Sequence, residues 1–329
     1  MPLDLSVLKG RSVLVIGDVM LDEYISGTVR RVSPEAPVPV VETERVECLA
    51  GGAANVAVNI AALEGVSHLA GVVGSDGASL RLCAVLDEKG VDSRYFQSFD
   101  NRRTTVKTRV IAHGQQMLRL DSETARPLND SEEEAFLVQI VLALKHVDAC
   151  VLSDYAKGVL TQKVCQVAIA KANERRIPIV VDPKGTNYAK YRGATVITPN
   201  LTEAMSALGV LKAGLLASDQ VSDQDVEQFG MQLGEQCDSQ ILITRGAKGM
   251  SLIRAGETAL HIASQAHQVY DVTGAGDTVV AMLSLSLAAG FSPMIAASLA
   301  NVAAGVVVNK LGTATVTLPE LEFAARSIL

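Results

Sequence analysis

Short apolar runs alternate with longer helix-like segments through most of the chain, and this alternation restricts the possible folds more than any other feature. It predicts an α/β fold, with a central, mostly parallel sheet, right-handed crossovers and helices on both faces. The expected strands are 13–18, 149–153, 177–181, 195–198 and 240–244, and the expected helices between and around them are 52–63, 131–145, 161–175 and 225–235.

Polar residues follow these predicted strands directly. In a parallel sheet the carboxyl ends of the strands meet at one edge, and that edge is where ligands bind. One strand-end Asp is often only a helix cap, but helix capping alone is a poor explanation for polar residues at the ends of five strands. They are Gly17-Asp18, Ser153-Asp154, Asp182-Pro-Lys184, Pro199-Asn200 and Thr244-Arg-Gly246.

Two segments with the character of exposed strands interrupt the alternation. Between residues 24 and 48, valines lie among prolines and charges, and residues 104–121 alternate polar and apolar around His113-Gly114. The second pattern predicts a hairpin with one buried face. We expect segments 24–50 and 97–121, approximately, to form a small sheet that covers a cleft as a lid, within one domain spanning residues 1–329.

The segment Asp271-Val-Thr-Gly-Ala-Gly-Asp277-Thr carries the strongest functional signal. An apolar stretch without Gly or Pro follows at 278–289 and predicts a buried helix, which places Gly274, Ala275 and Gly276 at its N-terminus. Unpaired amides and the positive end of the helix dipole favour an anion there. Asp277 is suited to take a hydroxyl proton while these amides hold a transferred phosphoryl group. The alternative is an ordinary N-terminal Asp that satisfies helix amides.

Composition excludes several other classes of function. The net charge of −7 argues against nucleic acid or an anionic membrane as a partner. The five cysteines are scattered without a Cys-x-x-Cys pair, which indicates free thiols in a reducing compartment. Gly290 and Pro293 break the apolar stretch 278–309 into two core helices, and the N-terminus lacks a basic leader. We therefore expect a soluble, cytoplasmic protein.

Two motifs resemble the signatures of the ribokinase-like (PfkB) sugar kinases, and the resemblance runs essentially from end to end. The first is Gly17-Asp18…Asp22 together with Ala50-Gly51-Gly52-Ala-Ala-Asn55, and the second is the segment 271–278. The resemblance implies a ribokinase-like fold with a β-sheet lid, ATP as phosphoryl donor and Mg²⁺ as cofactor.

The same resemblance implies roles for individual residues. Asp277 would be the base that activates the acceptor hydroxyl, and the amides of Gly274, Ala275 and Gly276 would form the anion hole. The two glycines of the first motif would let the backbone approach the sugar, although they also fit a plain turn before a helix. The sugar contacts would come from Asp18, Asp22, Gly51, Gly52 and Asn55.

A second group of residues resembles the family's nucleotide site. Asn200-Leu-Thr-Glu203 is similar to its Asn-x-x-Glu element, in which Glu203 would hold Mg²⁺ through water, and the same residues fit a capping-box helix start. Adenine would pack near Asn301 and Val308. The resemblance also implies a monovalent cation near segment 271–273, where nothing local in the sequence confirms it. Thr244, Gly246, Lys248 and Gly249 would form the nucleotide-phosphate loop.

Several cationic side chains near the predicted site indicate that the sugar substrate already carries a phosphate. Lys157 and Lys184 follow predicted strands, and Arg109 lies in the predicted hairpin. Cations aimed at a cleft bind phosphate by charge and multiple hydrogen bonds. Any one of them could instead be a solvated surface charge or a contact to ATP.

Within the family, residues 15–24, 30–40 and 153–160 resemble the heptose 7-phosphate kinases. This implies ATP-dependent phosphorylation of the C1 hydroxyl of D-glycero-β-D-manno-heptose 7-phosphate, a step in lipopolysaccharide precursor synthesis. We expect the stand-alone form, without an adenylyltransferase domain, and a homodimer joined through the lid. The alternatives are a kinase for another phosphosugar, such as fructose 1-phosphate or tagatose 6-phosphate, and a sugar sensor without catalytic activity.

Overall fold

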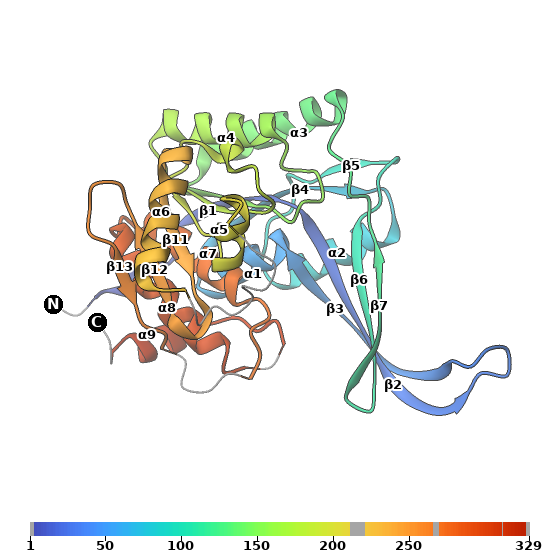
Figure 1. The fold of residues 1–329 in the computed structure, drawn as a ribbon. Helices are drawn as coiled ribbons and strands as arrows, with labels where there is room; N and C mark the ends of the chain where they lie inside the picture. The colour runs from blue at the N-terminus through green and yellow to red at the C-terminus, as the bar shows by residue number, and fades with distance from the viewer. Residues whose placement is uncertain (1–2, 211–220, 266–269, 311, 327–329) are drawn as a thin grey trace.

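The computed structural model describes residues 3–210, 221–265, 270–310 and 312–326. Within these ranges, nine strands form the main sheet (Figure 1). The neighbouring strands from β11 to β5 pair in parallel, and β12 and β13 add an antiparallel edge. In spatial order they are β13 (Leu260–Ile262), β12 (Met250–Ile253), β11 (Gln240–Thr244), β10 (Val196–Ile197), β9 (Ile179–Asp182), β8 (Ala149–Ser153), β1 (Ser12–Gly17), β4 (Val66–Gly74) and β5 (Gln97–Phe99).

Alternate side chains of the central strand β1 enter two separate hydrophobic cores. Val13 and Val15 pack into one core, while Leu14 and Ile16 pack into the other. Successive strand residues point to opposite faces, so a fully apolar strand requires helices on both sides. The predicted α/β class is confirmed.

The helices divide between these two faces. On the first face are α1 (Ala53–Ala62), α2 (Gly77–Glu88), α7 (Ala275–Ala288), α8 (Pro293–Val307) and α9 (Leu318–Ala325). On the second face are α3 (Asp130–Ala143), α4 (Gln162–Arg175), α5 (Leu201–Ala207) and α6 (Asp223–Cys237). Short 3₁₀ turns lie at Leu5–Leu8, Leu144–His146, Tyr188–Tyr191 and Gly246–Lys248.

The break predicted in the apolar C-terminal stretch lies between α7 and α8. Gly290 adopts a positive φ of 87°, and the Ser292 side chain caps α8, which begins at Pro293. In the described part of the chain, no helix has the length and hydropathy that crossing a membrane requires.

A separate four-stranded sheet projects from the main body (Figure 1), and we call it the lid sheet. The hairpin of β2 (Val19–Val32) and β3 (Pro39–Gly52) pairs through β2, in parallel, with the hairpin of β6 (Thr105–Ala112) and β7 (Gln115–Ser122). His113 and Gly114 form the second turn, both with positive φ.

The boundaries of the lid differ from the predicted ones in two places. β2 and β3 reach the main sheet, so the first hairpin spans residues 19–52 instead of starting at residue 24. Residues Gln97–Phe99, which we had placed in the lid, instead pair with β4 as the edge of the main sheet. Strand β4 and helix α2 were not anticipated at all.

Candidate active site

The N-terminus of α7 carries the glycine-rich segment. Gly274 caps the helix with a φ of 80°, a left-handed conformation that favours glycine. The first regular helical bond runs from the Thr278 amide to the Gly274 carbonyl (3.0 Å). The amides of Gly276 and Asp277 precede that bond and therefore belong to the group that a helix leaves without internal partners. The Ala275 amide, by contrast, already donates to the Val272 carbonyl (3.2 Å).

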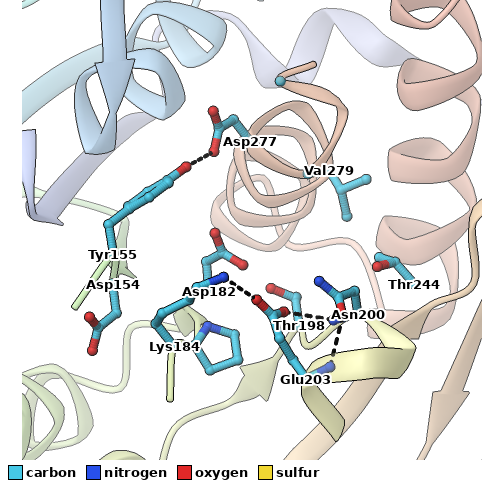
Figure 2. A pocket seen from close by; sticks show the side chains of 13 residues that line it. Asp154, Tyr155, Asp182, Lys184, Thr198, Asn200, Glu203, Thr244, Asp277 and Val279 are labelled. Atoms are coloured by element: carbon cyan, nitrogen blue, oxygen red, sulfur yellow. Dashed lines mark hydrogen bonds and ion pairs between the residues drawn. The ribbon is translucent and has the colours of Figure 1, made fainter. Parts of the chain in front are cut away.

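Asp277 is buried in the first turn of α7, and each of its carboxylate oxygens accepts one hydrogen bond. The Tyr155 hydroxyl donates to Oδ1 and the Asn55 amide Nδ2 donates to Oδ2, both at 2.6 Å. Figure 2 shows the first of these bonds, with the tyrosine ring reaching across from the loop after β8. Asp277 is therefore engaged by side chains rather than by helix amides, unlike an ordinary N-cap.

The side chain of Asn55 is itself oriented by its neighbours. Asn59, one turn later on α1, donates from Nδ2 to the Asn55 carbonyl (2.9 Å) and to its Oδ1 (3.4 Å). Because Asn55 Oδ1 accepts there, its amide nitrogen faces Asp277. The Thr278 hydroxyl completes this series of hydrogen bonds by donating to Asn59 Oδ1 (2.9 Å).

Burial raises the pKa of Asp277 to about 6 from an ordinary value of 3.8, while the hydrogen bonds from Tyr155 and Asn55 oppose that rise. The negative charge of Asp22 raises the pKa further. A carboxyl group with a pKa near 6 is ionised at neutral pH yet basic enough to accept a proton, as general-base catalysis requires.

A polar cavity of about 220 Å³ lies beside Asp277, at the carboxyl ends of the sheet strands (Figure 2). Its acidic groups are hard oxygen ligands of the kind that Mg²⁺ prefers. The described residues contain no cluster of three or more acidic, His or Cys side chains that could hold a metal, so waters and phosphate would have to complete its shell. The lining includes Asp154, Tyr155, Asp182, Lys184, Thr198, Asn200, Glu203, Thr244, Gly274, Gly276 and Asp277.

Asp182, at the end of β9, is half-buried and lines this cavity. The structure gives its carboxyl no hydrogen bond within the described residues. Burial, reinforced by the charges of Asp277 and Glu203, raises its pKa well above the ordinary value. A divalent cation in the cavity would compensate this charge, so the residues present fit a magnesium ion.

Asn200 and Glu203 form a complete capping box at the start of α5. The Glu203 amide donates to Asn200 Oδ1 (2.8 Å), and the Asn200 amide donates to Glu203 Oε2 (3.0 Å). The other oxygen of Glu203 accepts from Lys184 Nζ (2.8 Å), as Figure 2 shows. The helix-start interpretation of this motif is therefore correct, and Glu203 still faces the cavity, where it can also serve a metal.

A second, more apolar cavity of about 330 Å³ shares Thr244, Gly276 and Val279 with the first. Asn301 lines it and donates from Nδ2 to the Ala263 carbonyl (2.7 Å). Val308, Gly246 and Gly249 line it as well. Two neighbouring cavities, one polar and one apolar, thus share lining residues at the N-terminus of α7. The polar one suits phosphates, and the apolar one suits a flat organic ring.

The comparisons with known proteins agree with this geometry. A family model described as pfkB family carbohydrate kinase matches residues 11–321, most of the chain. The chain belongs to the pfkB family of carbohydrate kinases. The prediction of an ATP-dependent sugar kinase is confirmed at the level of this family.

Curated relatives and solved structures add detail to this pfkB assignment. The chain is 48% identical over 316 residues to the Bifunctional protein HldE of Alcanivorax borkumensis, covering 95% of this chain and 63% of the relative. It is 46% identical over 327 residues to that of Pectobacterium carotovorum, covering 99% of this chain and 66% of the relative. The chain thus spans less than two thirds of the length of these relatives.

Two solved structures share the fold. An Arabidopsis thaliana ribokinase complexed with ribose and ATP superposes with a TM-score of 0.72 at 20% identity, covering 96% of this chain and 98% of that one. Phosphofructokinase-2 of Escherichia coli in complex with potassium gives 0.75 at 17% identity, covering 97% and 99%. The predicted ribokinase-like fold is therefore confirmed.

Asp18 of this pfkB kinase lies deeper than a sugar contact would suggest. Its carboxylate accepts three backbone amides of the loop that follows β8, from Tyr155 (2.9 Å), Lys157 (3.0 Å) and Val159 (3.2 Å). The side chain is almost completely buried. Its proposed bond to the sugar stays a prediction, whereas the contacts give it a structural role in shaping this loop.

Asp22 lies on the lid side of the site and is paired with a cation. Arg109 from β6 donates to Asp22 Oδ1 (2.5 Å) and lies 5.2 Å over the ring of Tyr24. A Cβ on Gly51 would stand 2.4 Å from Asp22 Oδ2 and 2.9 Å from Met20 Cγ, so a larger residue would displace these side chains. At Gly52 the φ is 58° and a Cβ would meet the Asp18 carbonyl oxygen at 2.5 Å.

The two lysines predicted to bind a sugar phosphate lie apart. Lys157 pairs with Glu123 (2.6 Å), which follows lid strand β7, whereas Lys184 lies in the polar cavity with Glu203. Asp271 accepts amides of Thr273 (2.9 Å) and Gly312 (3.1 Å) with its two oxygens. The monovalent-cation site expected there stays a prediction.

Two residues of the site were not singled out from the sequence. Tyr155 had no signal of its own, because its partner Asp277 is 122 residues away. Asp182 was noticed at a strand end but was given no role. Both lie at or just after the end of a strand and line the polar cavity, and only the fold reveals the cavity.

Proposed function

We propose that this chain transfers a phosphoryl group from ATP to the C1 hydroxyl of D-glycero-β-D-manno-heptose 7-phosphate, in lipopolysaccharide precursor synthesis. The observation that carries the proposal is the position of Asp277. This buried base stands at a helix N-terminus, with the polar cavity on one side and Asn55 and the lid-side residues on the other. The choice of heptose 7-phosphate rests on the motifs quoted above, and the relatedness to the HldE proteins supports it.

In this proposal the chain's own residues divide the work of phosphoryl transfer. Asp277 accepts the proton of the sugar hydroxyl as that oxygen attacks, and Asn55 keeps the carboxylate in position. The amides of Gly276 and Asp277 face the transferred group, where the negative charge is greatest. The Ala275 amide contributes less than we expected, because it already has a carbonyl partner.

The polar cavity is assigned to the phosphates of ATP and the apolar cavity to its adenine. Asp182 and Glu203 would hold Mg²⁺, partly through water, and the ion would supply positive charge to offset the charge of the phosphates. Lys184 belongs with this group, because it pairs with Glu203 inside the cavity. Thr244 lines both cavities and marks the point where the phosphates would meet the nucleoside.

The 7-phosphate is assigned to Arg109 and Lys157. Each is about four-fifths buried, and each is paired with a single carboxylate, Asp22 and Glu123 respectively. Arg109 has further donors that Asp22 does not use, and Lys157 has two further ammonium protons. Both cations therefore retain donors for a phosphate while their partners keep them in place.

The test compares three variants on heptose 7-phosphate and on unphosphorylated heptose. A charge-assisted hydrogen bond contributes roughly 1.5–3 kcal/mol, so Arg109→Ala and Lys157→Ala should each cost about tenfold or more in kcat/KM on the phosphosugar. Unphosphorylated heptose should be affected much less. Lys184→Ala is the internal control, and it should depress both activities equally.

Equal losses on both sugars for Arg109→Ala and Lys157→Ala would contradict the phosphate assignment. If the wild-type chain preferred fructose 1-phosphate or tagatose 6-phosphate, the choice of heptose would be wrong while the pfkB assignment would stand. Turnover of none of these sugars would favour a sugar sensor.

We also propose that the chain forms a homodimer through the lid sheet. Val46, Ile25, Val110 and Leu118 stand directly opposite one another and form an apolar row across all four strands. Val46 and Leu118 are more than half exposed. The opposite face carries Tyr24 and Arg109 towards the site. An exposed apolar face on a small sheet is typical of a protein interface.

A further inference from the structure

Tyr155 binds the carboxylate that we propose as the base. Its hydroxyl donates to Asp277 Oδ1 at 2.6 Å, and its side chain lines the polar cavity (Figure 2). Asn55 occupies the other oxygen in the same way. Each carboxylate oxygen has a second lone pair, so a sugar hydroxyl can still bind without displacing either donor.

The loop that presents Tyr155 is held by an unusually complete set of contacts. Asp18 accepts the amides of Tyr155, Lys157 and Val159. Arg102, itself buried, donates from Nη2 to the Lys157 carbonyl (2.6 Å). Ala156 has a φ of 56°, a conformation that residues other than glycine seldom adopt.

Asp154 anchors the start of the same loop. It accepts the Ala156 amide (2.7 Å) with one oxygen, and the Tyr191 hydroxyl (2.7 Å) and Lys190 with the other. Local backbone strain of this kind persists only where the surroundings enforce it. The fold therefore fixes the phenol ring of Tyr155 in one place, directly over Asp277.

We propose that Tyr155 is a positioning residue, whose hydroxyl keeps Asp277 ionised and correctly oriented until the acceptor hydroxyl arrives. This rests on the proposed function, since Asp277 has to be the base. In the step itself, the sugar oxygen forms a bond to the γ-phosphorus, the bond between that phosphorus and the leaving ADP oxygen breaks, and the sugar proton passes to Asp277. Tyr155 keeps its own proton throughout.

The charges around Asp277 explain why a neutral donor is needed there. Facing it are Asp22 from β2, whose charge Arg109 partly balances, and Asp182 from β9. Helices α1 and α8 carry no charged residue, and Asp277 is the one charge on α7. Lys184, across the cavity, is bound to Glu203. Within the described residues no cation bonds to Asp277, so the donors Tyr155 and Asn55 stabilise its charge.

The pKa directions agree with this division of roles. Burial raises the pKa of Asp277 to about 6, and the Tyr155 hydrogen bond is the largest effect that lowers it. Burial, together with the charge of Asp277, raises the pKa of Tyr155 well above its ordinary value. The phenol therefore stays protonated over the whole working range of pH.

Tyr155→Phe removes the hydroxyl and keeps the ring. Loss of a hydrogen bond to a buried charge should raise the pKa of Asp277 by about one to two. The acid limb of kcat and of kcat/KM against pH should move upwards by the same amount. Activity at pH 7 should then fall about two- to tenfold, as the ionised fraction of Asp277 falls, and it should recover to within a few-fold of the wild type at pH 9. The KM for ATP should stay unchanged.

Tyr188→Phe is the matched control. The hydroxyl of Tyr188 is also buried, but it has no hydrogen-bond partner in the described part of the chain and lies outside both cavities. Its removal should leave the pH profile unmoved. A second variant replaces Tyr155 with 3,5-difluorotyrosine, a stronger donor of the same shape, and should move the acid limb downwards.

A readout without substrate separates this proposal from the proposed function. In protein with ¹³C-labelled aspartate carboxyls, the Asp277 signal, assigned by its loss in Asp277→Asn, should titrate higher in Tyr155→Phe than in the wild type. If the wild type phosphorylates none of the sugars, the proposed function fails, but this titration still tests Tyr155. An Asp277 titration that is identical in both proteins would overturn the role of Tyr155.

Discussion

Replacing the proposed base, Asp277→Asn, should abolish most of the activity and at the same time stabilise the fold. The side chain is buried, and its pKa of about 6 lies well above the ordinary 3.8. The folded protein therefore binds a proton at this position more tightly than the unfolded chain does. Stability is lost as pH rises from about 4 to about 6, and above that range the folded state carries the full cost of a buried charge.

The size of the stability effect follows from the difference between the two pKa values. One pKa unit corresponds to about 1.4 kcal/mol, so the cost is about 3 kcal/mol at pH 8 and about half of that at pH 5. A neutral amide avoids this cost. The introduced amide can accept from Asn55 with its oxygen and donate to the Tyr155 oxygen with its nitrogen, because a phenol can do both. The value is an upper limit, since charge-assisted bonds are exchanged for neutral ones.

The activity should fall by about 10²–10⁴ in kcat, the usual contribution of a general base, with much smaller changes in the affinities for sugar and ATP. The assay combines steady-state kinetics with urea unfolding of the wild type and the variant at pH 5 and pH 8. The variant should unfold at higher urea concentration at both, with the larger gain at pH 8. Near-wild-type turnover of a folded variant would refute the base assignment, and a stability loss at pH 8 would refute the electrostatic reasoning.

Two further predictions concern the metal and the dimer. Glu203→Gln keeps the capping box but removes the carboxylate. The Mg²⁺ concentration for half-maximal rate should therefore rise about 10–100-fold, while sugar binding without nucleotide is unchanged. If the Mg²⁺ concentration for half-maximal rate does not change, Glu203 is a helix-start residue alone. Leu118→Glu places a charge in the apolar row of the lid sheet and should give monomers by light scattering at micromolar concentration. The control is Val138→Glu, which changes an exposed valine of α3 and should leave the dimer intact. A wild-type protein that is monomeric under these conditions would contradict the proposed dimer.

The sequence predicts the parts of this fold that depend on local pattern. The apolar run from Val13 ends at Gly17-Asp18 where β1 ends, and Gly290 and Pro293 separate α7 from α8 as expected. The glycine-rich segment does open a buried helix. These features follow from periodicity and backbone preference, which depend on a few residues close together in the sequence.

The missed features depend on contacts between distant segments. Lys184 lies in the polar cavity with Glu203, whereas Lys157 pairs with Glu123 beside the lid, and this separation follows from the order of β8 and β9 in the sheet and from their different acidic partners. Tyr155 meets Asp277 only because β8 and α7 pack together. Residues 97–99 resemble a lid strand in sequence, and tertiary contacts determine that they pair with β4 instead.

The most direct test of the central claim is the identity of the product. The purified chain, with ATP, Mg²⁺ and D-glycero-β-D-manno-heptose 7-phosphate, should yield ADP and a sugar with two phosphates. In ³¹P NMR the new signal should couple to the anomeric proton of C1, and it should be absent with Asp277→Asn. A new phosphate coupled to any other ring proton, or ADP formed without a phosphorylated sugar, would contradict the account.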